Sequence, residues 1–304
     1  MEITSEQNKQ SQAFWNMRAP IYTKLLGKGN FPIMATLSNL SKISMSKTIL
    51  EVGCGASEGT KFLTLIAPKP SIIYSLDFSE AMLNLSLDNF KEFIDFNSNK
   101  DNSFELIKNE SQISISSDIK KHVKGTHVKF IQGDCEKLPF KDEQFDTYIS
   151  CLCLHITNDY HNALREAYRV IKKGGYFSCA VWGKKEWTNF RIIEKVCLKY
   201  GLEVKYFKNY RMSEDKDLIS FCEQIGFKNV RIGYSDLIRN VQDENEFYNN
   251  FFDMSLKKQI EEIKAKDPEK AKLIDDDIKK ALHQFFSVDK KVPVMNIMYL
   301  FGQK

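Results

Sequence analysis

The sequence predicts an α/β fold in which parallel strands alternate with helices. A β-branched apolar run at 48–52 leads into a turn containing Gly53 and Gly55 and then into a helical pattern. Further apolar runs of strand length recur along the chain, several of them followed by a helix signal. The 304 residues, with 42% hydrophobic content, suffice for one large α/β domain with additions or for two small domains.

Charge and composition exclude several classes of protein. The 44 basic and 40 acidic residues are interspersed, so we expect no dedicated polyanion-binding surface and no nucleic-acid partner. No apolar stretch reaches the length of about 18 residues that a membrane span needs. The first 12 residues have neither the apolar core of a signal peptide nor an Arg-rich transit pattern. We therefore expect a soluble, cytoplasmic protein.

The seven cysteines favour buried thiols in a reducing compartment. Their number is odd, they include no C-x-x-C pair, and several lie in apolar strands. Cys151 and Cys153 would point to the same face of a strand, but two ligands do not make a zinc site. We expect no metal.

The glycine turn predicts the type of ligand. A dinucleotide fingerprint would need a third glycine at position 58, where the chain has Glu58 at the expected helix N-terminus. A P-loop is excluded because no Gly-Lys-Ser/Thr follows, and Ser57 is the expected N-cap. The ligand should therefore lack phosphate. S-adenosylmethionine, which carries adenosine, an ammonium, a sulfonium and a carboxylate, fits this requirement.

The second strand is expected at Ser71–Leu76 and ends at Asp77. A carboxylate at this position can accept hydrogen bonds from both ribose hydroxyls, although it could also be a simple helix-start acid. Ser79 is expected to cap the next helix, which contains Met82. Residues 97–126 are rich in Asn, Ser and Lys and predict a long, mobile surface insertion.

The remaining elements continue the alternation. Strands are expected at His127–Gln132, Phe145–Leu154, Tyr176–Trp182, Lys228–Tyr234 and Val292–Phe301. Asp159 is expected to open a helix that includes Ile171, and residues 184–226 have a helical pattern. Asp267-Pro268 signals the start of another helix within a predicted helical cap at 236–290.

Three motifs resemble those of one family. Glu51-Val52-Gly53-Cys54-Gly55 resembles the first motif of class I S-adenosylmethionine-dependent methyltransferases. GDCEKLPFKDEQFD at 133–146 and ALREAYRVIKKGGY at 163–176 resemble segments of the ubiquinone/menaquinone-type (type 11) small-molecule methyltransferases. Ser57 replaces a frequent third glycine, and Lys173 replaces the usual proline.

The resemblance implies a Rossmann-like α/β fold with a seven-stranded, mostly parallel sheet, helices on both faces and an antiparallel last strand. It also implies an N-terminal helical lid at 1–46, ahead of a methyltransferase domain at 47–304. The lid resemblance rests on a W-x-x-x-A-x-x-Y segment that begins at Trp15. In such relatives the lid closes over the cofactor, which would place Tyr22 and Arg18 near its methionine end.

Site residues follow from strand ends and from the resemblance together. The predicted cofactor-binding residues are Arg18, Glu51, Gly53, Cys54, Gly55, Asp77, Phe78, Met82, Asp134, Cys135 and Cys151. On the resemblance, Asp134 and Cys135 contact adenine. His155, at the end of a core strand, is a candidate general base, with packing beside the cofactor as the alternative. Tyr22 is the second candidate for the catalytic group.

The predicted activity is methyl transfer from S-adenosylmethionine to a small or medium-sized molecule by in-line displacement. Two alternatives remain open at this point. One is a methyltransferase acting on tRNA or protein, and the other is a catalytically silent subunit that kept the fold. The sequence names neither the acceptor nor the oligomeric state.

Overall fold

The computed structural model describes residues 6–22, 28–96, 101–107, 124–189, 191–204, 210–239, 241, 243–251 and 254–304. The chain divides into two compact units. The first unit comprises residues up to Val181 together with Asp215–Gly233 and Met298–Lys304. The second unit comprises Trp182–Glu214 and Tyr234–Ile297.

The described strands form one sheet in the order β3-β4-β2-β1-β5-β6-β8-β7. They are β1 (Thr48–Val52), β2 (Ser71–Asp77), β3 (Ser103–Ile107), β4 (Thr126–Gln132), β5 (Phe145–Cys151), β6 (Ile171–Trp182), β7 (Lys228–Ile238) and β8 (Val294–Gln303). From β3 to β6 every neighbouring pair is parallel. All five β1 residues are buried, because helices cover both faces of a parallel sheet.

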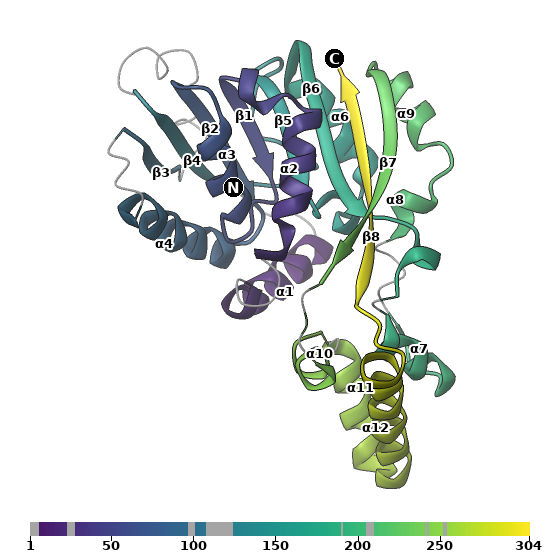
Figure 1. Ribbon diagram of the computed structural model, residues 1–304. Helices are drawn as coiled ribbons and strands as arrows, with labels where there is room; N and C mark the ends of the chain where they lie inside the picture. The colour runs from purple at the N-terminus through teal and green to yellow at the C-terminus, as the bar shows by residue number, and fades with distance from the viewer. Residues whose placement is uncertain are drawn as a thin grey trace. The chain divides into compact units, whose positions relative to one another are not determined.

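The last strand runs antiparallel to both of its neighbours, as expected. Backbone hydrogen bonds join Gly174 to Lys304 at one end of β6 and Gly183 to Asn296 at the other. On the other side of β8, Arg239 donates to the Pro293 carbonyl. In Figure 1 the β8 arrow accordingly points opposite to that of β7. The prediction of a mostly parallel α/β sheet is confirmed.

The sheet has eight strands among the described residues rather than the seven expected. The additional strand is β3, which pairs with β4 at the sheet edge. It lies within the predicted insertion at 97–126, where its five residues alternate between exposed and half-buried before Ile107. An edge strand with one solvated side lacks the apolar run used to identify the inner strands. Residues 97–100 and 108–123 of that insertion lie outside the described residues.

Helices of the first unit flank this sheet. They are α1 (Glu6–Tyr22), α2 (Phe31–Leu40), α3 (Glu58–Ile66), α4 (Glu80–Phe96), α6 (Tyr160–Val170) and α9 (Leu218–Gln224), with short 3₁₀ turns at Lys28–Asn30, Ile43–Met45 and Leu154–Ile156. In Figure 1, α2 lies in front of the strands and α6 behind them. The helix α6 ends at Val170, and Ile171, predicted to be helical, instead begins β6.

Two of the three helix caps predicted in this unit are present. The Asp159 carboxylate accepts from the Asn162 N–H at 3.0 Å, and the Ser79 hydroxyl accepts from the Met82 N–H at 3.1 Å. The cap predicted at Ser57 is wrong. Ser57 precedes α3 but has a φ of 69°, and its buried hydroxyl has no hydrogen-bond partner among the described residues. A left-handed residue does not have the extended backbone typical of a capping serine.

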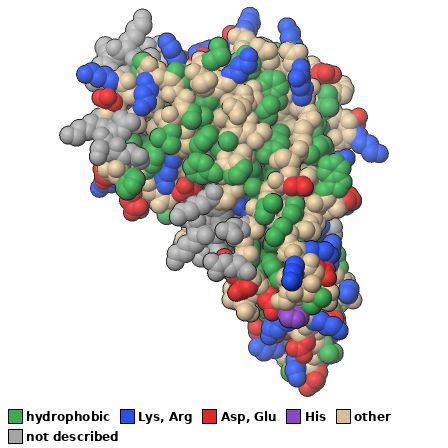
Figure 2. All heavy atoms as spheres, viewed as in Figure 1, with side chains coloured by type: hydrophobic (Ala, Val, Ile, Leu, Met, Phe, Trp, Pro, Cys, Tyr) green, Lys and Arg blue, Asp and Glu red, His purple; other side chains and the backbone are tan. Residues whose placement is uncertain are grey.

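The second unit is helical around its own apolar cluster. Its helices are α7 (Ile192–Lys199), α8 (Arg211–Glu214), α10 (Glu244–Phe251), α11 (Met254–Lys266) and α12 (Pro268–His283), which continues into a π-helical turn at Gln284–Val288. Ile274, Ile278 and Leu282 of α12 are buried in this cluster, and Asp267 caps α12 as predicted. Figure 2 shows charges of both signs interspersed over α11 and α12. Among the described residues, no helix is long and apolar enough to cross a membrane.

The Asp146 carboxylate joins the starts of three strands. Its Oδ2 accepts from the backbone N–H groups of Lys47 and Thr48 at 2.9 and 2.8 Å, and its Oδ1 accepts from the Lys172 ammonium at 2.6 Å. Partial burial opposes ionisation, but the Lys172 and Thr48 hydrogen bonds outweigh it and lower the pKa of Asp146. These bonds fix β1 against β5 and β6.

We expect Asp146→Ala to lower the free energy of unfolding at pH 7 by about 1–3 kcal/mol, since it removes the charged acceptor of hydrogen bonds from Lys47, Thr48 and Lys172. The folded-state pKa is depressed, so the stabilisation is present above the unfolded value of about 3.9 and is lost as the pH falls through the folded value. Urea unfolding at pH 7 and pH 3 should therefore show a difference that shrinks in acid. A constant difference, or one no larger than that of the exposed control Asp88→Ala on α4, would contradict this account.

Candidate cofactor-binding site

A pocket opens at the carboxyl ends of the parallel strands in the first unit. Because these ends meet at one edge of the sheet, residues that follow β1, β2, β4 and β5 come together there. The space is about 780 Å³ and is open to solvent. It is lined by Ser11, Trp15, Val52, Gly53, Gly55, Leu76, Asp77, Phe78, Met82, Gly133, Asp134, Cys135, Glu136, Cys151, Leu152, Cys153, Ile156, Thr157 and Asn158.

The glycine turn after β1 forms the floor of this pocket. Gly53 and Gly55 have φ values of 74° and 55°, which favour glycine. The N–H groups of Gly53 and Cys54 both donate to the Leu76 carbonyl of β2, at 2.8 and 3.1 Å. A Cβ at position 53 would lie 2.5 Å from the Cys153 Cβ. The turn therefore presents bare backbone to the pocket, and a larger residue at position 53 would clash.

Asp77 lies at the end of β2, where the sequence places a ribose-binding acid. Its Oδ2 accepts from the Gly55 N–H at 2.8 Å, and its Oδ1 accepts from the Ser79 N–H at 2.9 Å. Burial raises the pKa of Asp77 to about 6, and the backbone hydrogen bonds oppose this shift only in part. Each carboxylate oxygen retains a lone pair that a ligand hydroxyl could use.

Asp134 and Glu136 stand on the turn that follows β4. The Asp134 Oδ1 accepts from the Glu136 N–H at 2.8 Å, which fixes the turn. The Glu136 Oε1 accepts from the Asn158 N–H at 2.7 Å, and this bond links the turn to the segment after β5. Burial raises the pKa of Glu136. Two acids and two connecting loops thus form one wall of the pocket.

Glu51 and Cys54 lie deeper, beside a smaller space of about 340 Å³ that shares Gly53 and Cys151 with the main pocket. The Glu51 Oε2 accepts from the hydroxyls of Thr60 at 2.5 Å and Ser75 at 3.0 Å. Full burial raises the pKa of Glu51 to about 7, against the effect of these two hydrogen bonds. This buried carboxyl can therefore change protonation near neutral pH.

Helix α1 supplies part of the pocket, but through residues other than those predicted. Trp15 lines the pocket, and Gln12 donates to the Phe78 carbonyl at 3.1 Å. The Arg18 guanidinium lies 5.1 Å from the centre of the Phe14 ring, and Arg18 is not among the lining residues. The side chain of Tyr22 lies outside the described residues.

The predicted base His155 is buried on the 3₁₀ turn after β5, and it is not one of the lining residues. The three residues that follow it, Ile156, Thr157 and Asn158, do line the pocket. Three thiols also line it: those of Cys135, Cys151 and Cys153. A hydrogen bond with Cys153 and burial together raise the pKa of Cys135. None of the seven cysteines forms a disulfide.

The charges of the pocket restrict the ligand. Among the described residues, those lining it include three acids, Asp77, Asp134 and Glu136, and no Lys or Arg. Glu58 lies in the first turn of α3 and forms an ion pair with Lys61 at 3.0 Å. A pyrophosphate bound at this helix N-terminus would be repelled by the Glu58 carboxylate. These residues fit a neutral or cationic adenosine ligand and not a dinucleotide. Among the described residues, no group of three or more His, Cys, Asp or Glu side chains could hold a metal ion.

The structure brings eight of the eleven predicted cofactor-binding residues to the main pocket: Gly53, Gly55, Asp77, Phe78, Met82, Asp134, Cys135 and Cys151. Sequence reasoning did not name Trp15, Glu136, Cys153 or Asn158 as site residues. Trp15 stood in the W-x-x-x-A-x-x-Y segment and Glu136 in the motif at 133–146, so a signal existed for both. Asn158 is held beside the pocket by the hydrogen bond from its backbone N–H to the Glu136 carboxylate, and no local sequence pattern predicts this bond.

Comparisons with known proteins agree with these features. The family described as "Methyltransferase domain" matches residues 101–179, which contain the whole of the motifs at 133–146 and 163–176. Demethylmenaquinone methyltransferase of Bacillus subtilis is 27% identical over 196 residues, 60% of this chain and 71% of that protein. A 2-methoxy-6-polyprenyl-1,4-benzoquinol methylase of Danio rerio is 41% identical over 59 residues, 19% of this chain and 18% of that protein. The resemblance predicted from the three motifs is confirmed.

Solved structures show the same fold. A protein from Bacillus halodurans has a TM-score of 0.53 and 18% identity, with 89% of this chain and 98% of that chain covered. A phosphoethanolamine N-methyltransferase of Haemonchus contortus, solved with S-adenosylhomocysteine, has a TM-score of 0.51 and 15% identity, with 95% of this chain and 58% of that chain covered.

The raised pKa of Glu51 predicts a specific dependence of stability on pH. The pKa of Glu51 is about 7 in the folded protein and about 4.5 in an unperturbed glutamate, so between these pH values the folded protein holds a proton that the unfolded chain has lost. Stability should therefore fall as the pH rises through this range, by at most about 1.4 kcal/mol per pH unit from this group. Glu51→Gln keeps an acceptor for Thr60 and Ser75 and should flatten the slope. Urea unfolding from pH 5 to pH 8 measures it, and an unchanged slope would contradict this assignment.

Proposed function

We propose that this protein, an S-adenosylmethionine-dependent methyltransferase by its motifs and relatives, transfers the methyl group to a small or medium-sized molecule. The observation that carries the proposal is the pocket at the strand ends, which combines bare glycine backbone with acids and has no basic residue among its described lining. Two of the relatives named above are a demethylmenaquinone methyltransferase and a 2-methoxy-6-polyprenyl-1,4-benzoquinol methylase, so reduced quinols are the first acceptors to assay.

The cofactor would lie along the wall formed by the strand ends. Asp134 and Cys135 would contact adenine, Asp77 would accept from the ribose hydroxyls, and the Gly53 turn would follow the methionine portion. Glu51, beside the smaller adjoining space, would stand toward the cofactor ammonium. Arg18 stays a predicted contact for the methionine end.

The chain's own contribution to the reaction is mainly alignment. The bound cofactor supplies a methyl group already activated by the sulfonium. Trp15 and Met82 would exclude water from this side of the pocket, which favours displacement over hydrolysis. A base is needed only where the acceptor must lose a proton, and we propose His155 for that role, with Tyr22 as the second candidate.

Three features stay predictions: an N-terminal lid at 1–46, a helical cap at 236–290 and a cytoplasmic location. A polyanionic acceptor such as tRNA is not favoured, because the described residues that line the pocket include no basic residue.

The cofactor assignment is tested by calorimetry with S-adenosylhomocysteine. We expect micromolar binding, about −8 kcal/mol, and no binding of NAD. Asp77→Asn removes the charge that would accept the ribose hydroxyls and should weaken binding by about 1.5–3 kcal/mol. The control Glu80→Gln changes an exposed acid three residues further on and should leave the affinity unchanged. Binding of NAD without response to S-adenosylhomocysteine would refute the assignment.

The proposed base is tested with His155→Gln and a labelled methyl donor. Transfer into reduced quinols should fall about a hundredfold or more, the usual loss for a general base, while the affinity for S-adenosylhomocysteine stays the same. If turnover is unaffected, or if binding and turnover fall together, His155 has a packing role. Tyr22→Phe is then the next variant to assay.

A further inference from the structure

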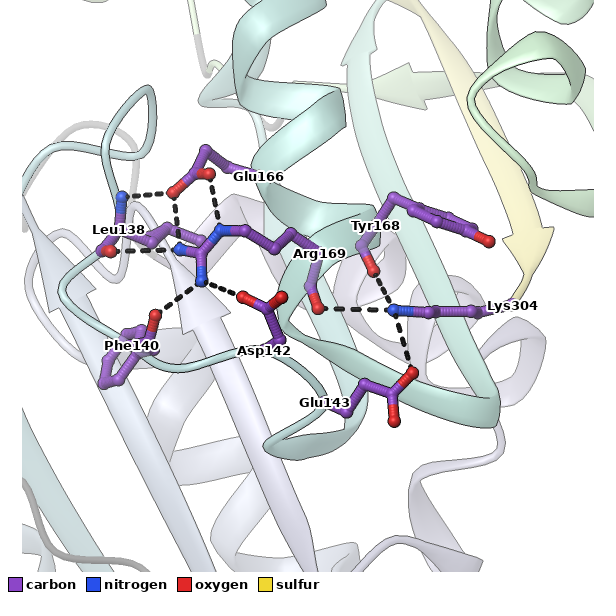
Figure 3. A network of polar contacts seen from close by, with 8 residues as sticks. All are labelled: Leu138, Phe140, Asp142, Glu143, Glu166, Tyr168, Arg169 and Lys304. Carbon is purple, nitrogen blue, oxygen red and sulfur yellow. Dashed lines mark hydrogen bonds and ion pairs between the residues drawn. The ribbon is translucent and has the colours of Figure 1, made fainter.

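The motif at 133–146, which follows β4, and the motif at 163–176, which includes most of α6, contact each other in the folded chain. The first motif contributes the irregular segment Glu136–Asp142, which follows the pocket turn. The second contributes Glu166 and Arg169, and Asn162 lies directly before it. These three residues are spaced four and three apart and therefore lie on one face of α6. The side chains of Asn162, Glu166 and Arg169 contact the backbone of this segment. Figure 3 shows the contacts of Glu166 and Arg169 with Leu138 and Phe140.

The contacts follow the chain in order. The Asn162 amide donates to the Glu136 carbonyl at 2.5 Å, and the Leu138 N–H donates to the Glu166 carboxylate at 2.7 Å. The Arg169 guanidinium then donates to the carbonyls of Leu138 at 3.2 Å and Phe140 at 2.6 Å. Three side chains of one helix thus satisfy four backbone groups of a segment that has no strand partner for them.

Arg169 uses all five of its N–H donors in this arrangement. Its Nε and one Nη2 hydrogen bind Glu166 as a bidentate pair at 2.7 and 2.8 Å, and one Nη1 hydrogen binds Asp142 at 2.9 Å. The other two donors bind the carbonyls of Leu138 and Phe140. The hydrogen bond with Glu166 raises the pKa of Arg169 further above its usual value. A planar five-donor fork is what distinguishes arginine from lysine at such a site.

We call the contacts that Asn162, Glu166 and Arg169 make with residues 136–142 the α6 clamp. The clamp begins at the residue where the pocket wall ends. Gly133, Asp134, Cys135 and Glu136 line the pocket, and Glu136 is also the first residue that α6 holds. The Asp134 carboxylate accepts from the Glu136 N–H, so a shift of Glu136 moves the acid that faces the ligand. Glu166 and Arg169 themselves do not line the pocket.

We propose that the Glu166–Arg169 pair is a positioning device that sets recognition of the adenine base by holding Asp134 and Cys135 in place from outside the pocket. The inference rests on the proposed function, since it requires adenine to occupy the wall formed by Asp134. It assigns one role to two separate sequence motifs. It also predicts that loss of the clamp affects adenine recognition more than the remainder of the cofactor site.

The test compares two ligands, S-adenosylhomocysteine and S-inosylhomocysteine, which replaces the adenine 6-amino group by an oxo group. The variant is Arg169→Gln. The matched control is Lys304→Gln, because Lys304 belongs to the same network, contacts the carbonyls of Tyr168 and Arg169, and does not touch the segment from 136 to 140 (Figure 3). Binding of both ligands is measured by calorimetry, with the folded state checked by thermal unfolding.

We expect wild type and Lys304→Gln to prefer the adenosine ligand by the same factor. Arg169→Gln should bind S-adenosylhomocysteine about tenfold more weakly, with little change for the inosine ligand, so the preference shrinks. Equal losses for both ligands, or no loss, would overturn the inference. If Arg169→Gln does not fold, Glu166→Gln, which retains an acceptor for the Leu138 N–H and loses the ion pair, must show the same selective change. Failure of wild type to bind either ligand would instead refute the proposed function, and the inference with it.

Discussion

The fixed backbone between β1 and α3 is the constraint on which the rest of the site depends. Gly53 and Cys54 both donate to the Leu76 carbonyl, and Gly55 donates to the Asp77 carboxylate. These bonds attach the glycine turn to the neighbouring strand, so the two strand ends move as one body. Only left-handed glycine backbone permits this path beside Cys153, since a side chain at position 53 would clash with it. Asp77, the acid proposed to bind the ribose, is therefore held in place by the same turn that lines the pocket.

The electrostatics of the site follow from this arrangement. Burial raises the pKa of Asp77 to about 6 and that of Glu51 to about 7, and the described residues that line the main pocket and the smaller space beside Glu51 include no Lys or Arg. Such carboxylates would be costly unless a ligand supplied compensating hydrogen bonds or positive charge. A ligand with ribose hydroxyls and an ammonium does so, whereas a pyrophosphate would add repulsion. We propose that these acids select the type of cofactor and that the contacts made by α6 refine recognition of its base.

Strand ends and motifs were enough to predict eight of the residues that line the pocket. The glycines, Asp77 and Asp134 could be placed because strand ends of a parallel sheet converge and because each follows a recognisable apolar run. Ser57 shows the limit of such reasoning, since its identity suggested a cap while the tertiary path of the turn gave it a left-handed backbone. The edge strand β3 was missed because half-exposed residues carry no continuous apolar signal. The clamp was beyond prediction, because Glu166 and Leu138 are 28 residues apart and meet only in the folded chain.

The central claim is that the strand-end pocket holds a phosphate-free adenosine cofactor through its acids and its glycine turn. A crystal structure of the protein with S-adenosylhomocysteine tests this most directly. The account predicts density along the wall from Asp134 to Gly53, with the ribose hydroxyls within hydrogen-bond distance of Asp77 and the adenine beside Asp134 and Cys135. Ligand bound elsewhere, or adenine placed away from Asp134 with the ribose not contacting Asp77, would contradict it.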